Sequence, residues 1–576
     1  MKRKLHTVLV TMGILLAACS EPEVEKTVYL KDFLTPGAAE TDGVPAVRAA
    51  LEHCIEVGAS RLVLPGGRLC LRSDQAVEKY QFISNNDESL KRIAFDLCGM
   101  RDFTIEGNGT ELLFTGFVSP FSITDCRNIT IRNLSIDYTR TFHSEGVVTA
   151  KGPDWLELEF PDDYFCDIVN GCLRFRDAEG TVYPFSSLLE FDTEKREPAF
   201  RANDVWLWSR TVPAEKLPDG RVRIHHKGIT ATIGNVMVFG AAARYNPGFT
   251  VSDSEQVTIR DVNLYHCGGM GVIAQRSRDV ELNKLVIVPS PSTKRRMISI
   301  TADATHFVNC AGYIRMIDCI FENQKDDATN IHGLYMAVER MTAPDGLLLR
   351  WHNSGQYGVD FLREGMRIEL VDNDSLGSYA HRTIRSVRRL NKVYTEVTFT
   401  KPLPEGVKER HLVAADEEYP DVLIKGCRMR GNRARGLLLG SRGRTVVEDC
   451  YFHIAGAAIL FEGDGNFWYE QSGVRDVTIR NNLFENGNYG SLNWGSACIA
   501  VGSGIPNREA SRYHRNIRVE GNTFRVFDSR IINLYCVDGF CFTADNHIEQ
   551  TEDYPGVYDE LRHFVTAQCD HINIKK

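Results

Sequence analysis

The sequence lacks the features of several protein classes. It has no run of lysines and arginines, and its 576 residues carry a formal net charge of -9, so a basic surface for nucleic acid is absent. No Cys-x-x-Cys pair and no cluster of cysteines and histidines has the spacing of a zinc site. We therefore expect neither a nucleic-acid partner nor a structural metal.

A dense disulfide framework is also missing. Of the 16 cysteines, one (Cys19) lies in an N-terminal signal-like segment, and the remaining 15 are odd in number and scattered without short regular spacings. This pattern predicts mostly buried free thiols. Cys427 and Cys450 are 23 residues apart at the same place in a strand pattern, which favours a ladder of small buried thiols over a metal site or a disulfide.

No apolar stretch at the N-terminus is long enough to span a bilayer. A basic start at Lys2 to Lys4 is followed by a mostly apolar stretch from Leu5 to Leu16 and by small residues before Cys19. Residues 1–19 resemble a bacterial lipoprotein signal in which Cys19 is lipidated; a plain secretory peptide cut near Cys19 is the alternative. Residues 20–27 would be a tether, and its acidic Ser20-Glu21-Pro22-Glu23 resembles short signals for export to the cell surface. We expect a chain that is lipid-anchored to the outer membrane. The four acidic-tract residues favour exposure at the cell surface and leave an anchor that faces the periplasm as the alternative.

A short sequence pattern typical of a β-strand repeats along the chain. Alternating apolar residues, many of them β-branched, end in Asn, Asp, Cys or Gly, as in QVTIRDVNLYHC from Gln256, DVELNKLVIV from Asp279 and DVTIRNNLFENG from Asp476. Adjoining copies are 23 residues apart, for example at Ile259 and Leu282. A unit of this length buries its apolar face only by stacking on its neighbours. The sequence therefore predicts an all-β fold, a right-handed parallel β-helix or solenoid.

The repeat has a beginning and two interruptions. An extended segment, a turn, an amphipathic helix over 45–57 and a strand over 61–65 predict an N-terminal cap for the open end of the solenoid. Longer strands with charged turns interrupt the repeat twice, which predicts two small antiparallel β-barrel-like modules inserted at coil corners, where they would wall one face of the helix. The expected segments are cap and first coils at 28–139, a module at 140–245, coils at 246–337, a module at 338–416 and final coils at 417–576.

Three aspartates carry the candidate chemistry. Asp303 precedes Asp326 and Asp327 by 23 and 24 residues, about one coil. With Asp303 aligned one coil above Asp326, the two would be separated by the ~5 Å between adjacent strands, so repulsion would keep one carboxyl protonated near neutral pH. A cluster of three could also reach the ~6.5 to 9.5 Å of an inverting glycosidase, against ~5 to 5.5 Å in a retaining one. A calcium site or a solvated corner is the alternative.

Hydrogen-bonding side chains surround these carboxyl groups in the same two coils and in later ones. Thr305 and His306 accompany Asp303, and His306 and His332 are as much candidates for structural histidines as for substrate contacts. Trp468 could stack on a sugar ring, although local packing explains a single aromatic residue equally well. Carboxylates and arginine can read sugar hydroxyls through paired hydrogen bonds. The candidate substrate-binding residues are Asn309, Asn330, His332, Asn432, Arg435, Glu462 and Asp464.

The run DATHFVNCAGYIRMIDCIFENQKDDATNIHG from Asp303, together with the cap and the two interruptions, resembles glycoside hydrolase family 110. These are bacterial exo-acting α-1,3-galactosidases that remove terminal galactose from blood group B structures. The resemblance covers residues 28 to 570 and implies a β-helix with inserted β-barrel modules, an inverting mechanism and no cofactor. It also implies catalysis by Asp303, Asp326 and Asp327. Asp326 is assigned as the acid, and Asp303 with Asp327 as the pair that activates water.

Two other functions are compatible with the same scaffold. A polysaccharide lyase would need an arginine or lysine base beside an acidic substrate, usually with calcium, whereas this cleft is rich in carboxylates and suits a neutral sugar. A surface lipoprotein that binds glycans without cleaving them is the other alternative. The sequence does not decide between a branched, fucosylated substrate and a linear α-1,3-galactoside. Solenoid edges and the inserted modules could support a homodimer.

Overall fold

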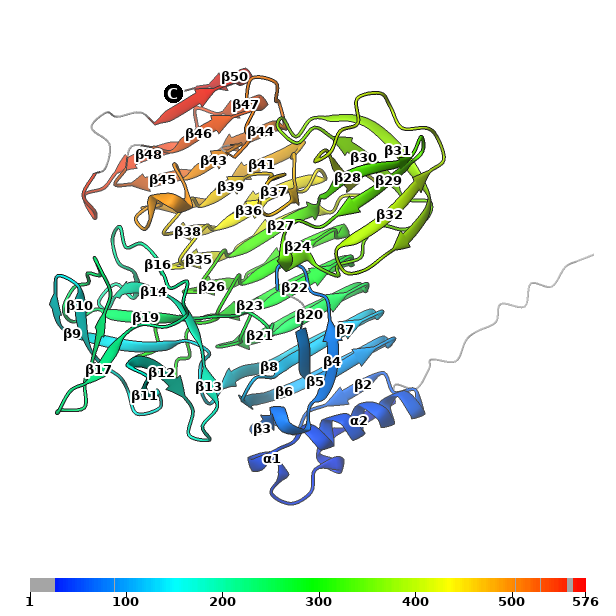
Figure 1. Ribbon diagram of the computed structural model, residues 1–576. Coiled ribbons are helices and arrows are strands. Elements are labelled where there is room, and N and C mark those ends of the chain that lie inside the picture. The colour runs from blue at the N-terminus through cyan, green and yellow to red at the C-terminus, as the bar shows by residue number, and fades with distance from the viewer. Residues whose placement is uncertain (1–25, 87–88, 503, 529, 557–562, 576) are drawn as a thin grey trace, which may run out of the picture.

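The protein is described here by a computed structural model covering residues 26–86, 89–502, 504–528, 530–556 and 563–575. A stack of parallel strands runs through the molecule, and an antiparallel module lies on either side of it (Figure 1). Cys19 and residues 1–19 lie outside the described residues, so lipid anchoring stays a prediction, which membrane fractionation of a Cys19→Ala variant would test. Within the described ranges, no helix is both long and apolar enough to cross a membrane.

Two large sheets form the stack. The larger contains 20 strands: β1 (Thr27–Tyr29), β2 (Arg61–Val63), β3 (Arg68–Arg72), β6 (Arg101–Thr115), β8 (Arg127–Tyr138), β21 (Glu255–Leu264), β23 (Arg278–Ile287), β25 (Ala311–Ile317), β26 (Ile320–Glu322), β34 (Asp421–Lys425), β35 (Arg428–Arg430), β37 (Arg444–Glu448), β38 (Tyr451–His453), β41 (Asp476–Arg480), β42 (Leu483–Glu485), β44 (His514–Glu520), β45 (Thr523–Val526), β47 (Val537–Phe542), β48 (His547–Gln550) and β50 (Asp570–Ile574). The smaller contains 13 strands: β4 (Val77–Gln81), β5 (Ser89–Cys98), β7 (Ser119–Thr124), β20 (Phe249–Ser252), β22 (Val272–Gln275), β24 (Thr305–Val308), β27 (Thr329–Leu334), β36 (Leu437–Leu439), β39 (Ile459–Phe461), β40 (Glu470–Gln471), β43 (Ile499–Val501), β46 (Ile532–Tyr535) and β49 (Phe564–Ala567).

The strand register confirms the parallel β-helix. Ile259 pairs with Leu282 between β21 and β23, and Ile424 pairs with Val447 between β34 and β37, both in parallel and both at the expected step. Because the same position of each coil is apolar, like side chains stack inside the helix, as in the aromatic row Phe452, Phe484 and Phe524 with ring centroids 5.0 and 4.7 Å apart. One continuous apolar core therefore runs from the cap to the last coils.

The corners of the coils hold residues in the left-handed backbone conformation. Asp253, Arg276 and Asn309 follow β20, β22 and β24 on three successive coils, with φ values of 52°, 49° and 47°. Asn and Asp tolerate this conformation better than most residues. Asn309 therefore adopts the left-handed conformation that the turn at its position requires.

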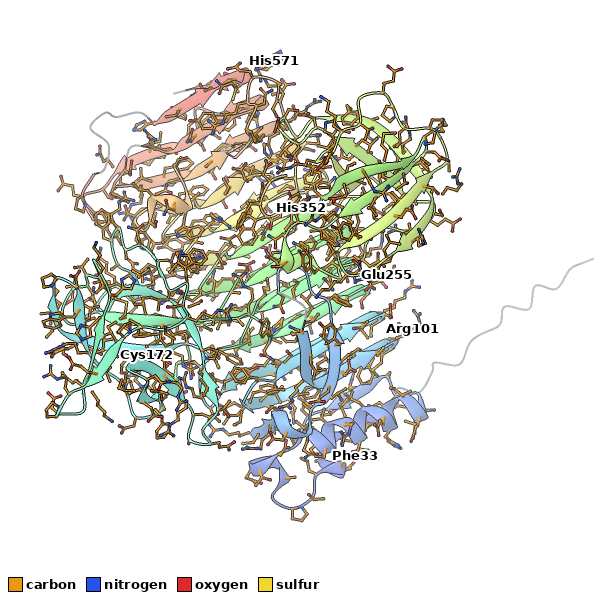
Figure 2. The ribbon with its side chains drawn as sticks, viewed as in Figure 1. Phe33, Arg101, Cys172, Glu255, His352 and His571 are labelled. Atoms are coloured by element: carbon orange, nitrogen blue, oxygen red, sulfur yellow. The ribbon has the colours of Figure 1, made fainter. Side chains whose placement is uncertain are left out.

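The cysteines form the expected ladder. Cys319, Cys427 and Cys450 lie just before the in-register strands β26, β35 and β38, and all three are buried free thiols. Each sulfur donates to a backbone carbonyl inside the stack, at 3.5 to 3.6 Å. Cys172 lies apart from them, in β12 of a flanking module (Figure 2). All 15 cysteines among the described residues are free.

The cap forms as predicted. Helix α2 (Val44–Val57) follows the short α1 (Ala38–Thr41), carries Pro45 in its first turn and ends at Gly58 in the left-handed region, at φ 63°. Its buried face, which includes Val47 and Leu51, joins the apolar core at the end of the stack (Figure 1). The helix therefore covers the core that an open solenoid would leave exposed.

Two antiparallel modules flank the stack (Figure 1). Module I contains an eight-stranded sheet, made of β9 (Ser144–Gly152), β10 (Trp155–Glu159), β14 (Phe185–Asp192), β15 (Glu197–Pro198), β16 (Val205–Trp206), β17 (Ala214–Lys216), β18 (Val222–His225) and β19 (Val236–Ala241), and a three-stranded sheet of β11 (Phe165–Val169), β12 (Cys172–Arg176) and β13 (Val182–Tyr183). Module II is a closed barrel of β28 (Met336–Ala343), β29 (Gly346–Arg350), β30 (Arg367–Val371), β31 (Ser378–Arg389), β32 (Tyr394–Phe399) and β33 (Leu412–Ala415). Each module has an apolar core of its own.

Candidate active site

A pocket of about 370 Å³ is lined by residues of the β-helix and of both modules. Its size lies in the ~300 to 1,000 Å³ range of small-molecule sites. The stack contributes Asp326 to its lining, the only one of the three aspartates to do so. Module I contributes Trp206, module II contributes the segment around Ser354, and a later loop contributes Phe467 and Trp468. Side chains distant in sequence thus enclose one carboxyl group.

The coil register places Asp303 above Asp327, not above Asp326. Thr305 pairs with Thr329, and the amide of Ala304 donates to the carbonyl of Asp327 at 2.9 Å, so the residues in line are 24 apart. The amide of Asp327 also donates to Oδ1 of Asp303 at 3.3 Å. The expected alignment of Asp303 with Asp326 was therefore wrong by one residue, because this coil is one residue longer than the 23-residue step used to set it.

Arg435 lies in line with Asp303 and Asp327, one coil further along the β-helix. Thr329 pairs with Leu437, which places Arg435 next to Asp327. Its Nε and Nη2 donate to Oδ1 and Oδ2 of Asp327 at 2.9 and 2.7 Å, and its amide donates to Oδ1 at 2.9 Å. Burial raises the pKa of Asp327 to about 7 in spite of this ion pair. Arg435 thus contacts a catalytic candidate and not the pocket, where it had been expected to bind sugar.

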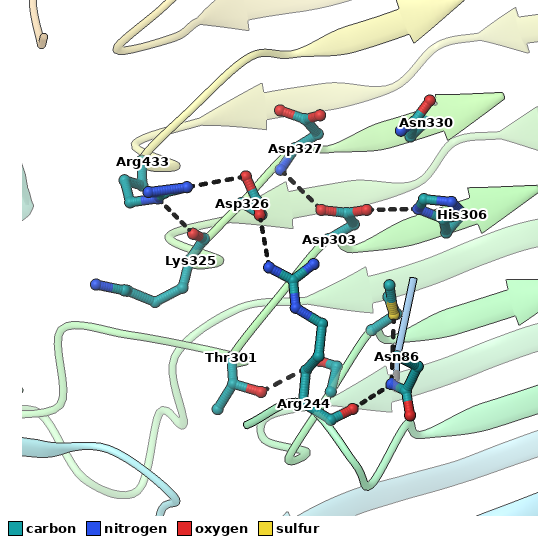
Figure 3. Close-up of polar contacts among 12 residues, drawn as sticks. Asn86, Arg244, Thr301, Asp303, His306, Lys325, Asp326, Asp327, Asn330 and Arg433 are labelled. Atoms are coloured by element: carbon teal, nitrogen blue, oxygen red, sulfur yellow. Dashed lines mark hydrogen bonds and ion pairs between the residues drawn. The ribbon is translucent and has the colours of Figure 1, made fainter. Parts of the chain in front are cut away.

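Asp326 lies outside this line of residues, and its side chain reaches the pocket. The side chain is 14% exposed, against 5% for Asp303 and 1% for Asp327. Figure 3 shows two guanidinium groups that hold it: Nη2 of Arg433 contacts Oδ1, and Nη2 of Arg244 contacts Oδ2, both at 3.2 Å. Burial opposes ionisation of Asp326, but the two arginines outweigh it and hold the carboxyl pKa below its usual value.

Asp303 has the opposite electrostatic environment. Its burial and the nearby charge of Asp326 raise its pKa to about 7. Its Oδ2 lies 2.6 Å from Nδ1 of His306 (Figure 3). In the free site the proton therefore sits on Asp303 while Asp326 is ionised. This is the reverse of what the assignment of Asp326 as the acid requires at the start of a reaction.

The aspartates are also the one group among the described residues with a spacing suited to a metal ion, since one oxygen of each lies within 4.8 Å of the others. Every carboxylate oxygen of the three already faces a nitrogen of the chain, from the arginines, His306 or a backbone amide. Three arginines also offset the negative charge that would attract a cation. The arrangement suits acid and base chemistry better than cation binding.

Four of the expected sugar-binding residues instead support the backbone. Nδ2 of Asn432 donates to the carbonyls of Arg435 and Asp326, at 2.6 and 3.1 Å. Asn309 accepts the amide of Leu334 at its corner, and Glu462 accepts the amide of Gly504. Asp464 accepts the amides of Asn466, Phe467 and Trp468 and so shapes the turn that brings two aromatic residues to the pocket. None of the four lines the pocket.

Asn330 and His332 lie behind the aspartates. Both are buried on β27, and Asn330 pairs in register with His306. Nδ2 of Asn330 lies 3.5 Å from Oε1 of Glu470, and Nε2 of His332 lies 3.5 Å from the same oxygen. Neither lines the pocket. His332 instead contacts His306, which in turn contacts Asp303.

Several pocket residues were not predicted from the sequence. Arg433 belongs to the same GNRARG run as Arg435, and Lys325 directly precedes Asp326. Their closeness in sequence to candidate residues was the signal that could have identified both. Arg244 and Trp206 come from the end and the middle of module I, and nothing in their local sequence marks them. Nζ of Lys325 is buried without a hydrogen-bond partner in the described structure, and burial lowers its pKa to about 8.

Comparisons with known proteins give two domain matches and several full-length relatives. Residues 144–237 match the GLAA-B beta-barrel domain I, and residues 347–413 match the GLAA-B beta-barrel domain II. These ranges lie within modules I and II. The chain is 33% identical over 537 residues to alpha-1,3-galactosidase A of Shewanella woodyi, covering 92% of this chain and 87% of that protein. It is 29% identical over 555 residues to alpha-1,3-galactosidase B of Bacteroides thetaiotaomicron, covering 95% and 90%.

Among solved structures, the chain is similar to the endo-xylogalacturonan hydrolase of Aspergillus tubingensis. The TM-score is 0.39 at 10% identity, and the match covers 95% of this chain and all of that one. At this level of similarity, the fold assignment depends on the strand pairing described above.

Proposed function

This chain belongs to the family of the α-1,3-galactosidases A and B, and from this premise we propose that it removes terminal α-1,3-linked galactose from glycans in exo fashion. It is a glycoside hydrolase. The observation that carries the proposal is the group of three aspartates, with oxygens within 4.8 Å of one another, of which one opens into a pocket between the two modules. Hydrolysis of a glycosidic bond usually needs two carboxyl groups, one that protonates the leaving oxygen and one that activates water or attacks the sugar.

Asp326 would protonate the glycosidic oxygen, because it is the carboxyl group that lines the pocket. A neutral sugar placed over Asp326 displaces water from it, which raises its pKa. Asp303 and Asp327 lie behind it and would take a proton from the attacking water. The proton ends on Asp303 and Asp326 ends ionised, so one turnover leaves the charges found in the free site.

The cycle is completed by moving one proton from Asp303 back to Asp326. One oxygen of each lies within 4.8 Å of the other, a distance that one bridging water spans. Atoms and charge balance in this scheme: water supplies a hydroxyl to the anomeric carbon and a proton to the cluster, and the cluster supplies a proton to the leaving oxygen. No external reactant besides water is needed.

We also propose inversion at the anomeric carbon. The family resemblance supports it, whereas the spacing of the carboxyl groups does not, because oxygens within 4.8 Å are closer than the ~6.5 to 9.5 Å usual for inverting enzymes.

The substrate we propose is a blood group B-type glycan, branched and fucosylated, with linear α-1,3-galactosides as a second class. Exposed aromatic residues at the pocket support room for more than one sugar: Trp206 is 50% exposed, and Phe467 and Trp468 are 66% and 42% exposed. Flat aromatic surfaces bind the apolar faces of sugar rings. A neutral sugar also suits a pocket in which the arginines near Asp326 are already paired with carboxylates.

Proton NMR of the first products tests the function and the stereochemistry together. Mixing the protein with B trisaccharide, and separately with α-1,3-galactobiose, should release galactose first seen as the β-anomer, and the two rates give the branching preference. Initial α-galactose would contradict inversion. Unsaturated products would indicate a lyase, and binding without release would indicate a glycan-binding protein; either would exclude the proposed activity.

Replacing Lys325 by Met should lower kcat/KM by about 10- to 100-fold, mainly through KM. The buried Nζ has no partner in the described structure and lines the pocket, so a sugar hydroxyl would complete its hydrogen bonding, and a bond to a charged donor contributes about 1.5 to 3 kcal/mol. With a pKa of about 8, the amine is charged below pH 8 and neutral above it. KM of the unmodified protein should therefore rise as pH increases through 8.

The variant should not show this rise, because it has no amine to titrate. Lys425→Met serves as the control, since Lys425 is on the surface, 48% exposed and paired with Glu448. Equal KM values for Lys325→Met and the unmodified protein at pH 7 would contradict a role for Lys325 in binding sugar.

A further inference from the structure

A row of buried hydrogen bonds leads from Asp303 away from the pocket. Oδ2 of Asp303 lies 2.6 Å from Nδ1 of His306, whose Nε2 lies 2.9 Å from Nε2 of His332. Nδ1 of His332 lies 2.6 Å from the carbonyl oxygen of Gly333. The side chains of Asp303, His306 and His332 are 5%, 0% and 3% exposed. The row crosses from β24 to β27, and Figure 3 shows its first two members.

The positions of the protons in this row follow from its last member. A carbonyl oxygen can only accept, so Nδ1 of His332 must donate to Gly333. A neutral imidazole carries one proton, so Nε2 of His332 is then an acceptor, and Nε2 of His306 must donate to it, because two lone pairs would repel at 2.9 Å. His306 has then used its proton and accepts at Nδ1. Asp303 must therefore donate, and its carboxyl group is protonated.

The surroundings keep both histidines neutral. Burial, with the charge of Arg244 in addition, lowers the pKa of His306 to about 3, against the attraction of Asp326. Burial also lowers the pKa of His332, against the attraction of Glu470, which lies 3.5 Å away. Asp303 itself faces Asp326, Arg244, Arg435 and the amide of Asp327. An imidazolium in the row would need a stronger counter-charge than these groups provide.

We propose that His306 and His332 are positioning residues that fix one exchangeable proton on Oδ2 of Asp303. This inference rests on the proposed function for its catalytic meaning, because the proton held there is the one that returns to Asp326 between turnovers. A hydrogen bond to a neutral acceptor stabilises the protonated carboxyl. His332 does not touch Asp303 or the pocket, so its effect passes entirely through the tautomer of His306.

Replacing His332 by Phe removes the acceptor that holds the proton on Nε2 of His306. His306 can then carry its proton on Nδ1 and donate to an ionised Asp303, so Asp303 holds its proton less tightly. The decreasing limb of kcat/KM near pH 7 reports loss of that proton from the free enzyme and lies below the limb expected from Lys325 near pH 8. This limb near pH 7 should move to lower pH by about one unit. A merely structural role would lower stability or rate without moving the limb.

Thr329→Val is the matched control. Thr329 is buried on the same strand, and its hydroxyl accepts a hydrogen bond from Thr305 at 2.7 Å, outside the row. The control should keep the pH limb in place while losing a comparable hydrogen bond. A limb that stays in place in His332→Phe, or that moves equally in both variants, would overturn the proposal.

Neutron diffraction from deuterated crystals tests the row without any activity measurement. Deuterium should appear on Oδ2 of Asp303, Nε2 of His306 and Nδ1 of His332, with none on Nδ1 of His306. Deuterium on Nδ1 of His306, or on both nitrogens of either ring, would overturn the inference even if the protein cleaves galactosides. The predicted pattern in a protein that releases no galactose would uphold the row and contradict only the proposed function.

Discussion

Replacing Asp326 by Asn should reduce the release of galactose by at least about 10² to 10⁴-fold, the usual contribution of one general acid or base. Asp326 is the one aspartate of the three that lines the pocket, and Asn keeps its size while removing its ability to transfer a proton. The measurement is kcat/KM for B trisaccharide, with thermal unfolding to show that the fold is retained. The same substitutions at Asp303 and Asp327 should also abolish hydrolysis.

A matched control exists in the same coil. Asp318 is a left-handed corner residue, at φ 53°, and Asn tolerates this conformation as well as Asp does. Asp318→Asn should keep kcat/KM within a few-fold of the unmodified protein. If Asp326→Asn is as active as this control, the proposed site is wrong.

The Asp326 variant also reveals the role of its side chain. An acid is needed less when the leaving group departs readily, so Asp326→Asn should retain much more activity on an aryl α-galactoside with an acidic phenol than on the trisaccharide. The Asp303 and Asp327 variants should lose activity equally on both substrates, since water activation is needed for each. The opposite pattern would reverse the assignment and agree with the charges of the free site, where Asp326 is ionised.

Replacing Arg435 by Met should destabilise the protein by about 3 to 5 kcal/mol, the usual cost of leaving one member of a buried ion pair without its partner. Asp327 is 1% exposed and receives three hydrogen bonds from Arg435. The backbone bond would remain, and the two guanidinium bonds would be lost. Urea unfolding at pH 7 measures the loss, and Arg428→Met, which breaks a half-exposed pair with Glu322, should cost less than about 1 kcal/mol.

The loss should shrink as the pH falls. Even with Arg435 present, burial holds the pKa of Asp327 at about 7, above the value of an unfolded aspartate, and removal of the arginine raises it further. The native state therefore binds more protons than the unfolded state between these values, so stability decreases as pH rises and recovers toward pH 4. The double variant Arg435→Met with Asp327→Asn should be more stable than Arg435→Met at pH 7. A single variant with stability independent of pH would contradict the buried-charge explanation.

Much of the candidate site could be located from the sequence, but its internal arrangement could not. The repeat placed Asp303, Asp326 and Asp327 on neighbouring coils because the period of the strands is visible in the residues. The local length of a coil is not visible in the same way, so the expected register was off by one and paired Asp303 with Asp326 instead of Asp327. Arg435 was expected to bind sugar, but the same register turns it onto Asp327.

The expected sugar contacts show the same limit. Asn309, Asn432 and Asp464 have side chains suited to sugar hydroxyls, yet each satisfies a nearby backbone group. Polar side chains at corners bind either substrate or their own turn, and residue type does not distinguish the two. Arg244 and Trp206 reach the pocket from module I, at sequence positions where no pattern marks them.

The sequence by itself determined the parallel β-helix, the ladder of thiols and the carboxylate cluster, because each depends on a spacing that recurs along the chain. It also indicated the two inserted modules, because they interrupt that spacing. Only the tertiary structure decided which aspartate meets the pocket, which arginines hold it, and where the proton rests in the row from Asp303 to His332. These depend on groups brought together from separate coils and modules. Their distances and burial set the charges, and neither quantity is written in the local sequence.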